Sequence, residues 1–339
     1  MRSFSNIDDM WADVLTELAL KGNALDSRAG DSVEIIGYQA RLTGLDKTFI
    51  LNPRRALSVT YAMAEMLWYL SGSCIIDALL PYAPQYVRFA EGNRAFGSYG
   101  YRWTSDPAYL AESQGSYSSQ LEAVTHLLRS KPNTRQAVIT MWNAGDLPHA
   151  ILGDHKDLPC TLTWQFLRRD DGLHLITTMR SNDVWLGFPY DVFVNTTILR
   201  LVAMALNVAP VSYTHQVGSM HLYTRNTRAA LEAISPRAMS ATRAVSNLRH
   251  LEPPPHPNLG WSHEHHSDVF VAAAAAVAFE HEMRTQKPEF HDWYKRVVST
   301  LGRTSPLYDA VLACAAKFTD IRADLFSSPL LREAFVRTR

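Results

Sequence analysis

Apolar residues recur with two different periods along the chain, and the two periods predict a mixture of helices and strands. A period near 3.6 residues predicts helices over 6–21, 52–72 and 189–206. Alternation of apolar and polar residues predicts strands that begin at Val33 and that lie within 135–142, 160–181 and 211–224. For the second helix, the expected N-cap, first helical position and stop are Asn52, Pro53 and Gly72.

The clearest strand pair is the hairpin in "CTLTWQFLRRDDGLHLITTMRS", which runs from Cys160 to Ser181. Alternation continues on both sides of the turn residues Asp171 and Gly172. The segment 82–118 is instead rich in Tyr, Gly, Ser and Asn, which predicts long loops with short helices. Strands and helices in this mixed order predict an α+β fold around one sheet.

The Pro-rich stretch "LEPPPHPNLG" at 251–260 is a stiff connector and marks the expected boundary. We expect a catalytic domain over 1–250 and a mostly helical extension over 251–339 that packs on the same domain. The longest apolar run, at 269–279, is too short and too rich in alanine to span a bilayer. No membrane contact is therefore expected.

Charge and cysteine content narrow the partners and the compartment. The 339 residues carry 33 Lys and Arg against 33 Asp and Glu, so no general attraction to nucleic acid or anionic membranes is expected. Any phosphate must be bound by a few placed arginines. Three cysteines without CxxC spacing argue against a disulfide framework and a cysteine zinc site. The polar N-terminal stretch is unlike a signal peptide, so we expect a cytoplasmic protein.

Two single residues are open to both a structural and a catalytic interpretation. Cys160, in "DLPCTLTW" at the mouth of a strand, is either a small buried apolar residue or a nucleophile. A nucleophile needs cationic neighbours, which Arg135 and Arg180 on adjacent predicted strands can supply. Glu65, in "AMAEMLWYL", either flanks the apolar stripe in solvent or is buried with a raised pKa that suits acid–base catalysis.

The run "HEHH" at 263–266 does not match HExxH or zinc-finger spacing, so we expect a solvated surface segment and no metal site. The stretch "RSNDVWLGFPYD" poses a different question, because it ends with the carboxylate of Asp191 in apolar surroundings. Burying a carboxylate costs several kcal/mol unless a partner compensates for it. That partner is either a structural cation or a ligand.

Five motifs together resemble the thymidylate synthase family. "AEMLWYLSG", "YGYRW", "LPC", "RSNDVWLGFPYD" and "GSMHLYT" occur in the family's order and approximate spacing, over roughly 25–230. The resemblance implies a large mixed β-sheet flanked by helices, which dimerises through the sheet face. It also implies a pyrimidine nucleotide substrate and 5,10-methylenetetrahydrofolate as the co-substrate, with no metal.

The same resemblance assigns roles to individual residues. Cys160 corresponds to the nucleophile that adds to C6 of the pyrimidine, and Glu65 to the group that manages protons and ordered water. Tyr99 corresponds to a tyrosine of the network that moves the C5 proton. The implied phosphate ligands are Arg28, Arg180, Ser181 and, across the dimer interface, Arg135. The implied contacts to the sugar hydroxyl are His221 and Tyr223, and those to the folate are Asp183, Tyr86, Phe89 and Gly187.

Departures from the family pattern point to a particular reaction. Asp191 stands where thymidylate synthases have an asparagine, whose amide fits N3–H and O4 of uracil. An ionised carboxylate only accepts hydrogen bonds, and it fits the amino group of cytosine and the N3–H that forms in the adduct. This aspartate is similar to that of the cytidylate 5-hydroxymethylases. Asp191 is therefore expected to read cytosine in CMP or dCMP.

A second departure concerns water. The ending "LLREAFVRTR" does not resemble the apolar tail that closes over the folate, and Tyr86 or Phe89 stands in place of an expected tryptophan. Water can then add to the exocyclic methylene intermediate and give a hydroxymethyl group. Two further departures leave the required chemistry in place: Gln136 replaces a second arginine, and Thr161 replaces a histidine after the nucleophile.

Several alternatives remain at this point. The chain is a methylating synthase if hydride reduces the intermediate, and a uridylate hydroxymethylase if Asp191 does not read the base. It is a non-catalytic nucleotide-binding homologue if Cys160 is not required for its activity, and a metal-dependent hydrolase if "HEHH" binds metal. The sugar is left open between ribose and deoxyribose. CMP is favoured because the C-terminal region resembles that of ribonucleotide-using hydroxymethylases of nucleoside antibiotic pathways.

Overall fold

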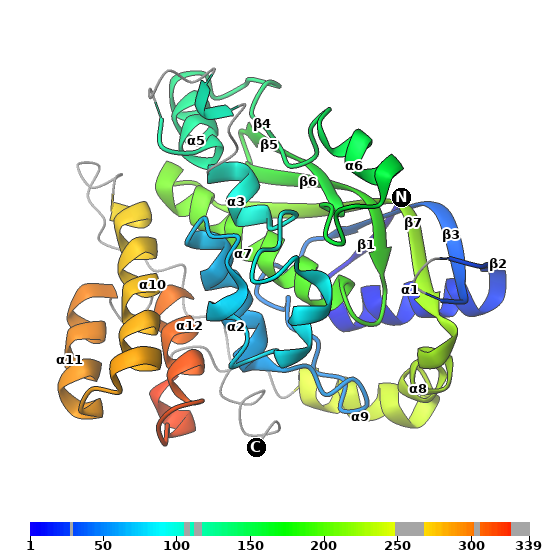
Figure 1. Cartoon of the computed structure of the whole chain (residues 1–339). Coiled ribbons are helices and arrows are strands. Elements are labelled where there is room, and N and C mark those ends of the chain that lie inside the picture. The colour runs from blue at the N-terminus through cyan, green and yellow to red at the C-terminus, as the bar shows by residue number, and fades with distance from the viewer. Residues whose placement is uncertain (28–29, 105–108, 112–116, 248–267, 302–305, 327–339) are drawn as a thin grey trace.

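A computed structural model describes residues 1–27, 30–104, 109–111, 117–247, 268–301 and 306–326 of the chain. Its centre is one seven-stranded mixed sheet in the order β1-β3-β7-β6-β5-β4, with β2 paired to β3 (Figure 1). The strands are β1 Arg2–Phe4, β2 Asn23–Leu25, β3 Ser32–Leu42, β4 Val138–Thr140, β5 Thr161–Arg169, β6 Gly172–Asp183 and β7 Pro210–Tyr223. β1 runs parallel to β3 and β6 parallel to β7, and the remaining pairs are antiparallel. The predicted α+β class with one mixed sheet is confirmed.

Helices flank this sheet and continue beyond it. The α-helices are α1 Ile7–Lys21, α2 Val59–Leu70, α3 Tyr99–Thr104, α5 Gln120–Ser130, α6 Asp146–Leu152, α7 Phe188–Leu206, α8 Thr227–Ala233, α9 Pro236–Asn247, α10 Asp268–Gln286, α11 Phe290–Leu301 and α12 Pro306–Ala315. The short 3-10 helices are η1 Ile76–Ala78, η2 Pro84–Phe89, η3 Thr224–Asn226 and η4 Ala323–Leu325. No helix among the described residues is long and apolar enough to cross a membrane.

The first predicted helix and the hairpin are confirmed. α1 begins after Asn6, whose side chain accepts a hydrogen bond from the Asp9 N–H, as an N-cap does. Its apolar face packs on β3, and the indole of Trp11 donates to the carbonyl of Val184 at 2.8 Å. β5 and β6 pair antiparallel as predicted, and Gly172 begins β6 at a φ of 130°, a backbone angle that favours glycine.

The predicted start of the second helix is wrong, because α2 begins at Val59 and not near Asn52. The Asn52 side chain does bind backbone groups, but not those of a helix. It accepts from the Arg54 N–H at 3.0 Å and donates to the carbonyl of Ala233 at 3.0 Å. It therefore stabilises a turn. Ser58 is the actual N-cap and accepts from the Tyr61 N–H at 3.2 Å.

The sheet buries one face against helices. α7 packs on β6 and β7, and alternate residues that point toward it, such as Leu175, Met179 and Val217, are almost fully buried. The residues between them, such as Thr178 and Gln216, lie on the opposite face of the sheet and are only half-buried. This second face is the one through which the predicted dimer would form.

The described C-terminal residues are helical, as predicted, and pack against α2. α10 and α12 both contact α2, and Figure 1 shows α10, α11 and α12 gathered on that side of the molecule. The Tyr82 hydroxyl donates to Glu280 at 2.8 Å, and Arg284 pairs with the same carboxylate. The connector at 251–260 and the "HEHH" run lie outside the described residues.

Candidate active site

The predicted site residues of β6 and β7 lie side by side where these parallel strands end. The register pairs Ser181 with Ser219 and Asp183 with His221. The Ser181 hydroxyl lies 3.4 Å from Nδ1 of His221, whose ring meets that of Tyr223 edge to face at 5.0 Å. The structure thus brings together the implied phosphate and sugar ligands of the two strands. The guanidinium of Arg225, a residue that the sequence did not single out, lies 4.1 Å from the Tyr223 ring.

Cys160 lies beside these strands, at the end of the loop that leads into β5. Its carbonyl accepts from the Arg180 N–H at 2.8 Å, which fixes the loop to β6. Burial raises the pKa of the Cys160 thiol to about 11, although the charge of Arg180 acts in the opposite direction. Desolvation and the Arg180 cation thus act in opposite directions on this thiol, and desolvation has the larger effect.

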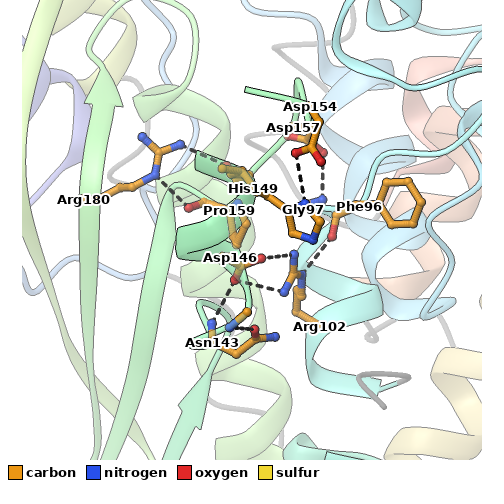
Figure 2. Close-up of polar contacts among 12 residues, drawn as sticks. Phe96, Gly97, Arg102, Asn143, Asp146, His149, Asp154, Asp157, Pro159 and Arg180 are labelled. Atoms are coloured by element: carbon orange, nitrogen blue, oxygen red, sulfur yellow. Dashed lines mark hydrogen bonds and ion pairs between the residues drawn. The ribbon is translucent and has the colours of Figure 1, made fainter. Parts of the chain in front are cut away.

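The Arg180 guanidinium contacts the loop that carries Cys160. Its Nε donates to the carbonyl of Pro159 at 3.1 Å (Figure 2). Its Nη2 donates to the carbonyl of Leu158 at 3.0 Å. The same side chain borders an open cavity of about 450 Å³. The other residues that line this cavity include Trp142, His149, His155 and Lys156. A cavity bordered by the cations of Lys156 and Arg180 can hold an anion such as a nucleotide phosphate.

Two further contacts hold segments that precede Cys160 in the chain, and the sequence did not predict either. Arg102 and Asp146 form a buried ion pair with bonds of 2.7 and 3.1 Å (Figure 2). Asp157 accepts from the Gly97 N–H at 3.1 Å, and burial raises the pKa of Asp157 to about 6. Arg102 belongs to the "YGYRW" motif, so the sequence indicated that this segment belongs to the site, but it did not indicate the ion pair with Asp146.

Asp191 lies in the first turn of α7, where it is buried without a cation among its described partners. Its Oδ2 accepts from Nδ2 of Asn182 at 2.7 Å. Burial raises the pKa of Asp191 to about 7, and the Asn182 hydrogen bond lowers it by less. A Cβ on Gly187 would lie 2.9 Å from Nδ2 of Asn182 and 3.1 Å from Oδ2 of Asp191. Gly187, implied as a folate contact, thus makes room for the bond between these two side chains.

Glu65 lies on α2 and is 8% exposed, which decides against a solvated position. Its Oε1 accepts from the Tyr61 hydroxyl at 2.6 Å. Burial raises the pKa of Glu65 to about 8, with the Tyr61 hydrogen bond opposing and the Asp191 charge adding to the shift. At neutral pH the Glu65 side chain is therefore mostly a neutral acid.

The predicted folate contacts Tyr86 and Phe89 pack against each other near Glu65. The ring of Tyr86 packs edge to face on that of Phe89, with centroids 5.8 Å apart. Burial raises the pKa of Tyr86, as do the nearby carboxylates of Asp157, Glu65 and Asp191. Phe89 is 52% exposed, so it lies at the outer edge of this group. Tyr99 is buried and its ring centroid lies 5.1 Å from that of Tyr69.

Asp183 offers a hydrogen-bond acceptor that the described residues do not use. Its Oδ1 accepts from the backbone N–H groups of Trp185 and Leu186, at 2.7 and 3.1 Å. Its Oδ2 is buried and has no hydrogen-bond partner in the described part of the chain. Burial raises the pKa of Asp183. A buried acceptor without a partner suits a ligand that donates an N–H group.

One predicted phosphate ligand, Arg135, is not part of this group, and another is not described. Arg135 is exposed just before the edge strand β4, and its carbonyl accepts from the Gln165 side chain at 2.9 Å. Arg28 lies outside the described residues.

A group of three residues could hold a metal ion, since ligand atoms of His149, Asp154 and His155 lie within 4.8 Å of one another. Lys156 and Arg180 border the same cavity, however, and their charges oppose a further cation.

A comparison with known protein families relates this arrangement to one of them. The model of the thymidylate synthase family matches residues 9–252, which is more than half of the chain. The match includes the strands and loops that carry Cys160, Arg180, Asp191 and His221. It ends before α10, so the last three α-helices lie beyond it.

Proposed function

Because this chain belongs to the thymidylate synthase family, which transfers a one-carbon unit from methylenetetrahydrofolate to a pyrimidine nucleotide, we propose that it is a cytidylate 5-hydroxymethylase. It would convert CMP or dCMP, methylenetetrahydrofolate and water to the 5-hydroxymethyl nucleotide and tetrahydrofolate. The observation that carries the proposal is the buried carboxyl of Asp191, which has an amide and no cation as its partner.

A carboxyl group with a pKa near 7 suits cytosine in two protonation states. When protonated, Asp191 can donate to N3 and accept from the amino group at C4. When ionised, it can accept from both groups once N3 carries a proton. Uracil offers N3–H and a carbonyl at C4, and an ionised carboxylate would repel that carbonyl.

Addition of the nucleophile requires this proton transfer. As the thiolate sulfur of Cys160 bonds to C6, the electrons of the C5–C6 double bond form a C4–C5 double bond, those of the N3–C4 double bond move to N3, and N3 takes the proton of Asp191. C5 thereby becomes nucleophilic. Desolvation opposes ionisation of Cys160, and the charge of Arg180 favours it.

The residues that we expect to contact the folate fit a ring that donates hydrogen bonds. The unpartnered Oδ2 of Asp183 would accept from a pterin N–H group, and the Tyr86 and Phe89 rings would border the bound molecule. Methylenetetrahydrofolate supplies the one-carbon unit when it is bound. Gly187 lies one turn from Asp191, and in this proposal it would lie between the folate and the nucleotide.

Water addition needs an acid–base group and a polar environment. Glu65, with its raised pKa and its bond to Tyr61, can hold a water molecule and exchange protons with it at neutral pH. The hydroxyl of Tyr86 adds a second polar group where the family usually has a tryptophan. We infer that these groups deliver water to the exocyclic methylene at C5.

The remaining substrate contacts involve two subunits. Arg180 and Ser181 would bind the phosphate, together with Arg28, and His221 and Tyr223 the sugar hydroxyl. Family members typically work as dimers, and the half-buried sheet face is available for such contact. In that dimer the exposed Arg135 would reach the phosphate of the other subunit.

The proposal is tested by incubating purified protein with methylenetetrahydrofolate and, separately, CMP, dCMP and dUMP, followed by LC–MS of the nucleotides. A gain of CH₂O on one or both cytidylates is expected, and CMP is the first substrate to test. The Cys160→Ala variant is the control and should leave every nucleotide unchanged. Turnover of dUMP alone would refute the proposal, and turnover by Cys160→Ala would remove Cys160 from the mechanism.

A further inference from the structure

Four buried side chains form a line of hydrogen bonds that ends on Asp191. Nδ2 of Asn195 lies 2.9 Å from the hydroxyl of Tyr213, which lies 2.6 Å from Nδ1 of His215. Nε2 of His215 lies 3.0 Å from Oδ1 of Asn182, and Nδ2 of Asn182 lies 2.7 Å from Oδ2 of Asp191. None of these four side chains belongs to a residue more than 4% exposed. We define them as the Asn195–Asn182 relay.

The donors and acceptors allow one direction along the relay. Burial lowers the pKa of His215 to about 3, so its ring is neutral and carries one N–H. The Asn182 amide donates to a carboxyl oxygen, which leaves its own oxygen as the acceptor for Nε2–H of His215. Nδ1 of His215 must then accept from the Tyr213 hydroxyl, whose oxygen accepts from Asn195. Every donor therefore points toward Asp191.

This direction fixes the orientation of the Asn182 amide. A reversed amide would place its NH₂ group against Nε2–H of His215 and its oxygen against Oδ2 of Asp191. The first contact would then place two donors against each other, and the second would place two acceptors against each other. Both would be relieved only if His215 changed its tautomer and Asp191 carried its proton on Oδ2. A change of tautomer would in turn place Nδ1–H of His215 against the donating hydroxyl of Tyr213.

The fixed amide has a consequence for base recognition. Since Oδ2 accepts from Asn182, a proton on the Asp191 carboxyl must sit on Oδ1, the oxygen left for the base. A donor at Oδ1 fits the unprotonated N3 of cytosine and opposes the N3–H of uracil. With a reversed amide the proton would sit on Oδ2, and Oδ1 would accept from N3–H of uracil.

We propose that the Asn195–Asn182 relay makes Asp191 select cytosine over uracil by fixing which carboxyl oxygen can hold the proton. His215 and Tyr213 are positioning residues in this account, because they act on the base through Asn182 and Asp191. The inference rests on the proposed function, since it assumes that Asp191 faces the nucleobase.

Other titratable groups near Asp191 cannot replace the relay. The groups that interact electrostatically with it come from α2, η2, α3, the Cys160 loop and β7, and they are Glu65, Tyr86, Tyr99, Cys160 and Tyr213. All of them are acids, so their ionised forms would raise the pKa of Asp191. The Asn182 amide is the neighbour that lowers it.

The test compares His215→Met, which removes the donor to Asn182, with His215→Gln, whose side-chain NH₂ group can restore it. Tyr213→Phe is a milder variant that removes one hydroxyl. Tyr308→Phe is the matched control, because it removes another buried tyrosine hydroxyl, one that donates to the carbonyl of Leu325 at 3.0 Å in the C-terminal region.

Two quantities are measured for each variant. The first is the ratio of kcat/KM for cytidylate to kcat/KM for uridylate, which we expect to fall about tenfold in His215→Met, the effect of one lost polar contact. The ratio should fall less in Tyr213→Phe, recover in His215→Gln and stay unchanged in Tyr308→Phe. The second is the pKa of the Asp191 carboxyl by isotope-edited infrared titration, with Asp191→Asn as the blank. It should rise in His215→Met and Tyr213→Phe.

The two readouts separate this inference from the proposed function. If the wild type converts no cytidylate, the proposed function fails, and with it the role of the relay in base selection. If the wild type converts cytidylate but the folded Tyr213→Phe and His215→Met variants keep its ratio and its Asp191 pKa, the relay inference is overturned. Should His215→Met not fold, Tyr213→Phe decides the question by the same two quantities.

Discussion

Replacing Asp191 by Asn changes the base reader while keeping its size. The Asn182 NH₂ group points at this side chain, so the new amide must turn its oxygen toward Asn182 and its own NH₂ group toward the base. An NH₂ group in the place of Oδ1 still donates to the unprotonated N3 of cytosine, but it cannot give N3 a proton and cannot accept from N3–H in the adduct. We therefore expect Asp191→Asn to lower kcat for cytidylate and to leave uridylate disfavoured.

The magnitude follows from the contact that is lost when N3 becomes protonated. One mispaired buried polar group costs about 1–3 kcal/mol. A value of about 2 kcal/mol corresponds to roughly a 30-fold fall in kcat for cytidylate.

The assay measures kcat for cytidylate with methylenetetrahydrofolate, and the products are quantified by LC–MS. Asp157→Asn is the control, because it also neutralises a buried carboxyl with a raised pKa, one that lies three residues before Cys160. Its remaining oxygen can still accept from the Gly97 N–H, so kcat should not change. If Asp191→Asn keeps the wild-type kcat for cytidylate, Asp191 does not supply the proton to N3.

Three further predictions concern stability and selectivity. Burial raises the pKa of Glu65 from 4.5 to about 8, so Glu65 contributes stability at low pH that is lost as the pH rises through 8. This loss is at most about 5 kcal/mol. Glu65→Gln should abolish it, which urea unfolding from pH 5 to 9 would measure. Gly187→Ala should push Asn182 and Asp191 apart, lowering the free energy of unfolding by about 1–3 kcal/mol and the cytosine preference with it; unchanged selectivity would contradict this. Arg102→Met leaves Asp146 buried without its cation and should cost about 3–5 kcal/mol by chemical denaturation, whereas the double change with Asp146→Leu should cost less.

Most of the fold could be predicted because its elements have clear periodic patterns. The hairpin of β5 and β6 and the long helix α7 follow from alternation and helical spacing within 160–206. The start of α2 could not be predicted, because the capping residue Asn52 binds the carbonyl of Ala233, far along the chain. A local pattern carries no information about that contact.

The site shows the same division between local and tertiary information. The motifs identified Asp191, but its pKa depends on burial that only the fold creates. Asn182 and His215 come from β6 and β7, and their contact needs the parallel register of these strands, which no local pattern encodes. The Cys160 thiol shows the same division, since the sequence showed the nearby arginine and not the depth of burial that raises the thiol pKa.

The most direct test of the account is the origin of the oxygen in the product. The reaction of cytidylate with methylenetetrahydrofolate would be run in ¹⁸O-labelled water and the nucleotide analysed by LC–MS. The account predicts a product that gains CH₂O carrying the heavy oxygen, together with tetrahydrofolate. A product that gains only CH₂, together with dihydrofolate, would show that the intermediate is reduced and would contradict the account.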